Sequence, residues 1–133
     1  MTMDANAMAD ALGVAIKARD ADAIAALYAE DIGVWHGATG KVQNKAENVG
    51  LLRAVFAVTS EIGYHNIRRH QIEGGVVQQH QLKGRFADGV EMPVLEIAIF
   101  IWSRGGKIVR IDEYFDSAQF GELGRRLEAL ASA

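Results

Sequence analysis

Apolar residues recur at helical intervals in the first and last parts of the chain. Between residues 5 and 17, Met8, Leu12 and Ile16 fall on one face of a predicted helix. Asn44, followed by Glu47 three residues later, is typical of a capping box and predicts that another helix begins there. The other predicted helical faces hold Ile24 and Leu27; Val49, Leu52, Val55 and Phe56; and Phe120, Leu123, Leu127 and Leu130.

Beyond Thr59 the pattern changes from helical spacing to alternation, which is typical of strands. A short strand is also expected just before Gly37. The longer predicted strands span residues 61–72, 76–86, 92–103 and 107–115, with glycine-containing turns between them. Helices followed by consecutive strands predict an α+β fold in which the helices cover the concave face of a curved antiparallel sheet.

The last predicted strand carries one carboxylate in an otherwise apolar row. Because strand side chains alternate between faces, Val109, Ile111, Glu113 and Phe115 share one face. A carboxylate on a buried face is paired, hydrogen-bonded or functional. Glu113 is therefore the central candidate for a functional site.

Alternation assigns the faces of the two preceding strands with unequal clarity. In the second long strand the even positions are the less polar set, which places Gln78 and His80 on the concave face. In the third long strand both sets are apolar, so both faces need a cover. We expect Ile97, Ile99 and Ile101 to face outward and to be covered by a second copy of the chain in a homodimer. The alternative is that the C-terminal helix covers them.

These assignments predict an apolar pocket with a few polar groups, which is typical of a small-molecule site. The candidate catalytic residues are His36, His80 and Glu113. The candidate ligand-binding residues are Val34, Tyr64, Gln78, Glu96, Phe100, Trp102, Ile111 and Phe115.

A histidine near a carboxylate can act as a general base, with the carboxylate orienting the ring and stabilising its cationic form. His36 or His80 would be the base and Glu113 its support; alternatively, a His80–Glu113 pair is purely structural. Two histidines and a carboxylate also have the composition of a facial metal triad. No tight spacing motif supports that assignment, so we expect neither a metal nor another cofactor.

Composition narrows the classes of partner. With 133 residues the chain is expected to form one domain. Its net charge of −3, with scattered lysines and arginines, argues against a nucleic-acid or membrane partner. Cysteine is absent, so disulfide and thiolate chemistry are excluded. The first residues, Met1 to Asp4, do not begin a signal-peptide pattern, and a cytoplasmic protein is expected.

Two segments resemble a known family. Residues 27–36 (LYAEDIGVWH) and 106–116 (GKIVRIDEYFD) are similar to SnoaL-like proteins, in the superfamily of ketosteroid isomerase, limonene epoxide hydrolase and nuclear transport factor two. The similarity extends over about residues 10–127 and implies a cone-shaped α+β barrel with a pocket between sheet and helices. This fold hosts isomerases, polyketide cyclases, hydrolases, dehydratases and non-catalytic binders, so the resemblance does not choose among these activities.

Compared residue by residue, the chain reproduces neither of two well-known sites of that superfamily. His36 falls where ketosteroid isomerases hold their general-base carboxylate. Ala98 falls near their oxyanion-hole acid and cannot donate a hydrogen bond from its side chain. Glu113 matches an aspartate of limonene epoxide hydrolases, whose arginine and second aspartate fall near His80 and Leu82.

Two functions therefore stand as hypotheses. The first is a cofactor-free enzyme that acts on a small hydrophobic molecule by isomerase, cyclase or hydrolase chemistry. The second is a non-catalytic ligand-binding or dimerisation module of the same fold.

Overall fold

The structure is a computed structural model that describes residues 4–133. Residues 1–3, on which part of the signal-peptide expectation rests, lie outside the described residues. The helices are α1 (Ala5–Lys17), α2 (Ala21–Leu27), α3 (Lys45–Val58), the 3-10 turn η1 (Ser117–Gln119) and α4 (Gly121–Ala131). The strands are β1 (Tyr28–His36), β2 (Lys41–Gln43), β3 (Thr59–Ile72), β4 (Gly75–Phe86), β5 (Leu95–Arg104) and β6 (Lys107–Phe115). None of the helices in residues 4–133 is both long and apolar enough to cross a membrane.

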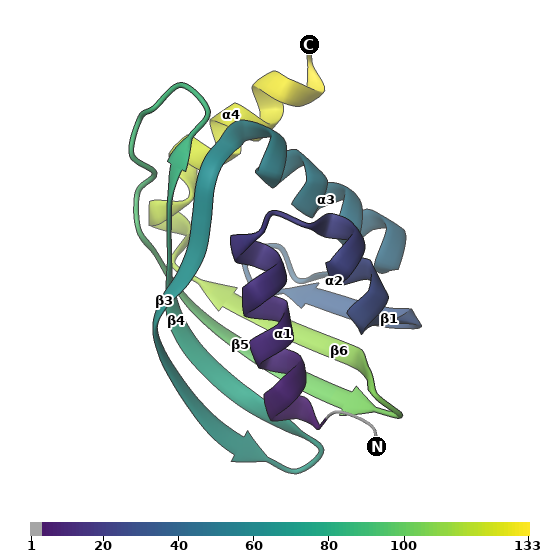
Figure 1. Cartoon of the computed structure of the whole chain (residues 1–133). Helices are drawn as coiled ribbons and strands as arrows, with labels where there is room; N and C mark the ends of the chain where they lie inside the picture. Colours follow the sequence, from purple (N-terminus) through teal and green to yellow (C-terminus); the bar gives the residue numbers. More distant parts are fainter. Residues whose placement is uncertain (1–3) are drawn as a thin grey trace.

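The strands form one curved, unclosed sheet in the order β2-β1-β6-β5-β4-β3. The four long strands predicted from the sequence are confirmed, and they pair antiparallel from β3 to β6. The expected all-antiparallel sheet is wrong in one respect, because β1 pairs with β6 in parallel. Helices α1, α2 and α3 lie on one side of this mixed sheet (Figure 1). The fold is the expected α+β cone.

Helices α1 and α3 begin where the sequence predicts, whereas α4 begins at Gly121, about three residues later than the predicted start near Ala118. The Asp4 side chain caps α1 by accepting from the Ala7 backbone N–H at 2.9 Å. At α3 both hydrogen bonds of the Asn44–Glu47 capping box are present, as expected. The buried faces of α1, α2 and α3 pack on the concave side of the sheet and form its core. The helical core residues include Met8, Leu12, Ile16, Ile24, Val49, Val55 and Phe56.

The turn between β5 and β6 fixes the register of the last strand. Gly105 and Gly106 both have positive φ, 61° and 76°, a conformation that glycine adopts without the steric cost of a side chain. With this turn, Glu113 lies opposite Ile99 and Ile111 lies opposite Ile101. Directly opposite residues share a face, so the carboxylate lies on the same side as the isoleucines of β5.

The prediction for the faces of β5 is therefore wrong. Ile97, Ile99 and Ile101 are buried on the concave face, beneath the helices, and cannot form an outward dimer contact. The alternate positions, including Phe100 and Trp102, face outward. Because both sets are apolar, alternation did not distinguish the faces, and a one-residue error reversed the whole strand.

Candidate functional site

A cavity of about 120 Å³ lies between the sheet, α3 and α4. Four polar side chains line it: His36, Asn48, Tyr64 and Glu113. The rest of its wall is apolar: Ile16, Leu51, Leu52, Val55, Phe56, Ile62, Leu82, Leu95, Ile97, Phe115, Phe120, Leu123 and Leu127. A few polar groups in an apolar enclosure are typical of a small-molecule site.

The parallel pairing of β1 and β6 places His36 directly beside Glu113. The His36 Nδ1 atom lies 3.0 Å from Glu113 Oε1, and the side chains are 14% and 27% exposed. The hydrogen bond to the Glu113 carboxylate raises the pKa of His36. The two residues are 77 positions apart in sequence and lie on neighbouring strands.

Two amide side chains, the partly buried Gln43 and the buried Asn48, support the other side of the imidazole ring. His36 Nε2 lies 2.8 Å from Gln43 Oε1, which also accepts from Asn48 Nδ2 at 2.9 Å. Tyr28 in turn donates its hydroxyl hydrogen to Asn48 Oδ1 at 2.8 Å, and burial raises the pKa of that hydroxyl. With the amides in this orientation, both ring nitrogens of His36 face acceptors, so the arrangement stabilises the imidazolium form.

These contacts divide the roles of the polar side chains. Both nitrogens of His36 are engaged, so the ring has no free lone pair for a ligand. Glu113 Oε1 accepts a hydrogen bond from His36 Nδ1, whereas Glu113 Oε2 has no hydrogen-bond partner within residues 4–133. The Tyr64 hydroxyl also has no hydrogen-bond partner in that range, and burial raises its pKa, so it stays a donor. The cavity therefore offers a ligand one carboxylate oxygen and one hydroxyl donor.

His80 does not join this pair. The ring is 3% exposed and stacks on Tyr64 with 3.8 Å between ring centroids, but it is not part of the cavity wall. Arg69 donates to Gln78 Oε1 at 3.0 and 2.7 Å, so the Gln78 amide nitrogen donates to His80 Nδ1 at 3.0 Å. The ring proton then lies on Nε2, which is buried without a partner in the described structure. Burial lowers the pKa of His80 to about 4.

The other predicted ligand-binding residues lie in three places. Tyr64 and Phe115 line the cavity. Val34, Gln78 and Ile111 are on the concave face but buried in the core outside the cavity. The inward placement of Glu96, Phe100 and Trp102 is wrong, because all three lie on the outer face of β5.

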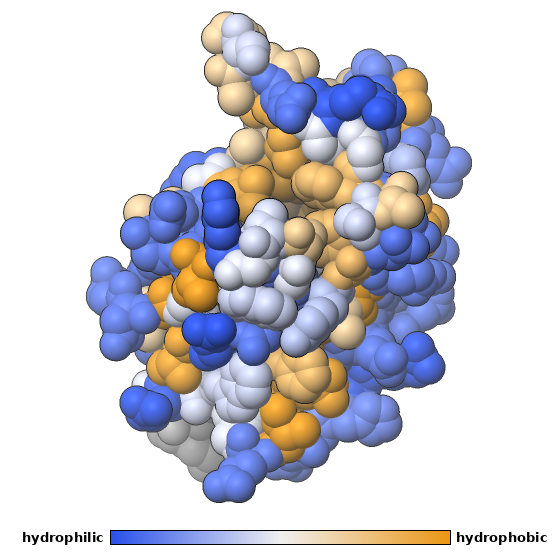
Figure 2. All heavy atoms as spheres, turned by 180° about the vertical axis from the view of Figure 1, so that it is seen from behind, coloured by the Kyte–Doolittle hydropathy of each residue, from blue (hydrophilic) through white to orange (hydrophobic). Residues whose placement is uncertain are grey.

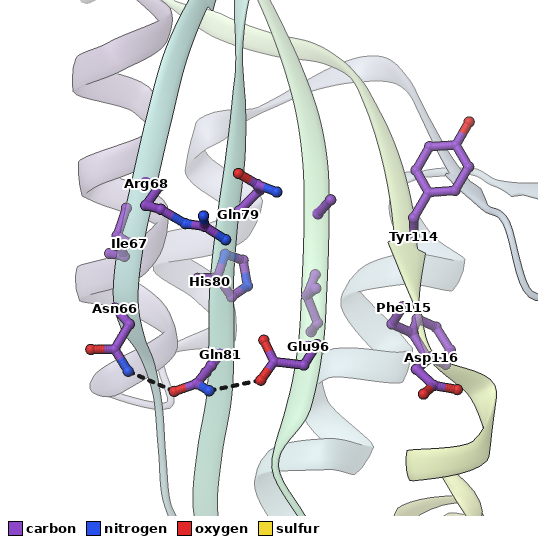
Figure 3. A pocket seen from close by; sticks show the side chains of 12 residues that line it. Asn66, Ile67, Arg68, Gln79, His80, Gln81, Glu96, Tyr114, Phe115 and Asp116 are labelled. Carbon is purple, nitrogen blue, oxygen red and sulfur yellow. Dashed lines mark hydrogen bonds between the residues drawn. The ribbon is translucent and has the colours of Figure 1, made fainter.

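Figure 3 shows the surroundings of Glu96 on that outer face. Glu96 accepts from Gln81 at 2.7 Å, and Asn66 donates to Gln81 at 2.6 Å, so the three side chains form a polar ladder across the strands (Figure 3). They line a shallow hollow of about 660 Å³ that does not include the His36–Glu113 pair.

Two residues of the site were not predicted. Asn48 lies on the apolar stripe of α3, four residues before Leu52, and a buried asparagine in such a stripe is a signal that helical spacing could have given. Gln43 lies on β2, a strand of three residues, and nothing in the local pattern marks it.

A metal triad of His36, His80 and Glu113 is not assembled. Among residues 4–133, no group of three histidine, cysteine or acidic side chains is placed to hold a metal ion. His80 stacks on Tyr64 and does not line the cavity that His36 and Glu113 share.

Solved structures with this fold include proposed enzymes and proteins without an assigned activity. A proposed polyketide cyclase from Pseudomonas putida KT2440 is 23% identical, with a TM-score of 0.76 over 90% of this chain and 97% of that one. IdmH, a proposed polyketide cyclase from Streptomyces antibioticus, is 16% identical, with a TM-score of 0.74 over 90% and 99%. A Catenulispora acidiphila protein with a ketosteroid isomerase-like fold, bound to trimethylamine, is 17% identical, with a TM-score of 0.71 over 86% and 92%.

At these identities the similarity shows a shared fold and no shared chemistry. No curated protein matches the sequence. The family model for the SnoaL-like domain matches residues 7–111, which spans β1, the helices α1 to α3 and most of the sheet. The protein belongs to the SnoaL-like domain family.

Proposed function

We propose that the protein binds small hydrophobic molecules that contain oxygen, and that it transforms them without a cofactor by general acid-base chemistry. The observation that carries this proposal is the hydrogen-bonded His36–Glu113 pair, at 3.0 Å, in the wall of an otherwise apolar cavity. The fold supports it more broadly, because proposed polyketide cyclases and a ketosteroid isomerase-like protein share it.

The contacts favour Glu113, rather than a histidine, as the proton acceptor. Its Oε2 atom takes a proton from the carbon next to a substrate carbonyl, and the electrons of the broken C–H bond move toward the carbonyl oxygen. The Tyr64 hydroxyl donates to that oxygen as negative charge develops on it. His36 holds Oε1 of Glu113 and fixes the direction of the carboxylate, while Gln43 fixes the ring. Return of a proton from Glu113 to the substrate restores the starting state.

The test is hydrogen exchange at carbon. Small ketones such as cyclohex-2-enone and cyclohexanone are incubated with the protein in D₂O, and loss of the α-proton signal is followed by NMR. Exchange well above that with heat-unfolded protein is expected for at least one compound. No exchange above that background with any of the ketones would contradict the enzymatic proposal.

One observation favours a second function. Apart from Glu113 Oε2, the contacts among His36, Glu113, Gln43, Asn48 and Tyr28 are made within the network itself. Such a cluster also suits a binding protein, in which the cavity holds a ligand without transforming it. Saturable ligand binding without exchange would favour this non-catalytic alternative.

We also infer a homodimer through the outer face of the sheet, with contact residues that differ from the sequence-based prediction. Trp35 and Tyr114 pack edge-to-face at 5.1 Å, and Phe100 contacts both Tyr114 and Trp102, at 6.1 and 5.9 Å. In Figure 2, apolar and weakly polar side chains lie across the middle of this face, with hydrophilic ones among and around them. Aromatic side chains on an open sheet face are typical of an interface core.

A single charge on this aromatic cluster is expected to separate the copies. Phe100→Glu should sediment as a monomer at concentrations where the wild type is a dimer, because an unpaired carboxylate would have to be buried. Val14→Glu is the matched control, since Val14 is 71% exposed on the helical side and should not change the mass. Equal masses for Phe100→Glu and the wild type would contradict this interface.

A further inference from the structure

We infer that the cavity selects neutral molecules of about one six-membered ring, and that α4, held in place by Arg126, sets this limit. The inference rests on the proposed function and names the class of ligand for the same site. It follows from the cavity volume, the charge balance of its polar end, and the contacts of the helix that closes it.

The volume decides the size class. Pockets for drug-sized ligands typically enclose about 300–1,000 Å³, whereas an engineered cavity of about 150 Å³ holds a single benzene. At about 120 Å³ the cavity of this protein belongs to the second class. A fused two-ring ketone, or any larger polycyclic molecule, does not fit unless part of the wall moves.

The polar end decides the charge class. His36 and Glu113 neutralise each other, so a charged ligand would find no unpaired countercharge within the cavity. The remaining groups are the Tyr64 hydroxyl, which donates, and Glu113 Oε2, which accepts. A neutral ring that carries one carbonyl or hydroxyl oxygen matches both.

Helix α4 forms the most adjustable part of the wall. It contributes Leu123 and Leu127 to the cavity and is preceded by Phe120, its N-cap residue, which also lines it; Leu123 is buried and the other two are partly buried. Figure 2 shows a hollow with apolar walls between this C-terminal helix and the sheet. A wall with so little buried surface needs an additional attachment to hold its position.

Arg126 provides that attachment. Its guanidinium lies 3.9 Å from the centre of the fully buried Phe86 ring on β4 and donates to Asp88 at 2.9 Å in the following loop. It also bonds Glu122 within α4 at 2.9 Å. One side chain thus fastens the helix to the strand and the loop beside the cavity. Arg126 acts on ligand size through the position of α4 and is a positioning residue.

The test measures binding, independently of turnover, by NMR titration of the protein with cyclohex-2-enone, 1-tetralone and cyclohexane carboxylate. Wild-type protein is expected to bind cyclohex-2-enone at least 10-fold more tightly than either of the other two. Equal or tighter binding of 1-tetralone would overturn the size limit, and equal or tighter binding of the carboxylate would overturn the charge class.

Three variants test the role of the helix. Arg126→Gln and Asp88→Asn each remove the charge from one side of the Arg126–Asp88 contact. Both are expected to narrow the ratio of the dissociation constants of 1-tetralone and cyclohex-2-enone at least threefold. Arg125→Gln is the matched control, because the Arg125 side chain is 70% exposed and pairs only with Glu122 in the described structure; its ratio should equal that of the wild type. If both Arg126→Gln and Asp88→Asn kept the wild-type ratio of ketone dissociation constants, the inference that α4 limits ligand size would be overturned.

Failure of this inference differs from failure of the proposed function. Exchange of larger ketones together with tight binding of 1-tetralone would overturn the size class and leave the catalytic proposal standing. Selective binding of cyclohex-2-enone without exchange of any ketone would overturn the catalytic proposal and leave the size class standing.

Discussion

Glu113→Gln is expected to lower protein-dependent exchange of ketone α-protons by a factor of at least about 100, since positioned general bases typically contribute 10²–10⁴-fold. Glutamine has nearly the same shape, and its oxygen can still accept from His36, so the cavity should keep its form. Its amide cannot take up a proton from carbon at neutral pH. The rate of deuterium incorporation in wild-type and variant protein gives the factor directly.

The matched control for this substitution is Glu61→Gln. Glu61 is also a strand carboxylate, but it is exposed on β3 and lies outside the cavity wall. The control should exchange at the wild-type rate, and thermal unfolding should show that both variants fold. If Glu113→Gln exchanged ketone α-protons at a rate within about threefold of the wild type, Glu113 would not be the general base.

The second large effect is a loss of stability in acid caused by His80. The pKa of this ring is about 4 in the folded protein, against about 6.5 in the unfolded chain. Below pH 6.5 the unfolded chain binds a proton that the folded protein does not, so the free energy of unfolding falls with decreasing pH. The loss from this group should reach about 2 kcal/mol at pH 5 and about 3 kcal/mol near pH 4, with no loss above pH 7.

His80→Gln is expected to remove this dependence, because glutamine does not titrate and can still accept from Gln78. Urea unfolding at pH 7, 6, 5 and 4 should show a shallower fall for the variant than for the wild type. His65→Gln is the control, since His65 is exposed on β3 and its loss should leave the wild-type slope. Equal slopes for wild type and His80→Gln would contradict the prediction.

His36 changes the free energy of unfolding with pH in the opposite direction to His80. Its pKa is raised by the Glu113 carboxylate, so the stability it adds is present below the pKa of an unfolded histidine. That contribution is lost as the pH rises through the folded pKa of His36. The two histidines can therefore be separated by comparing slopes below and above neutral pH.

Local signals predicted much of the fold because they act over a few residues. The Asn44–Glu47 pair marks the start of α3, and the glycines after Arg104 mark the turn into β6. The single carboxylate in the apolar row of β6 identified Glu113, which does line the cavity. In each of these cases the decisive chemistry lies within one helical turn or one strand.

The errors arose where the outcome depended on pairing between distant segments. Both faces of β5 are apolar, so only its register against β6 shows that Ile99 lies beside Glu113 and that Phe100 faces outward. In the same way, only the parallel pairing of β1 with β6 brings His36 to Glu113. Side-chain alternation specifies two faces but does not say which of them the helices cover.

The sequence by itself determined the elements, the order of the long strands along the chain and the presence of one carboxylate on the concave face of the last strand, because helix caps, turns and periodicity are local properties. The tertiary structure decided which histidine meets that carboxylate, which amides hold the ring and how much room remains in the cavity. Gln43 and Asn48 reach His36 only after β2 and α3 have packed beside β1. Cavity volume depends on how side chains from several helices and strands fit together, and no single stretch of sequence encodes it.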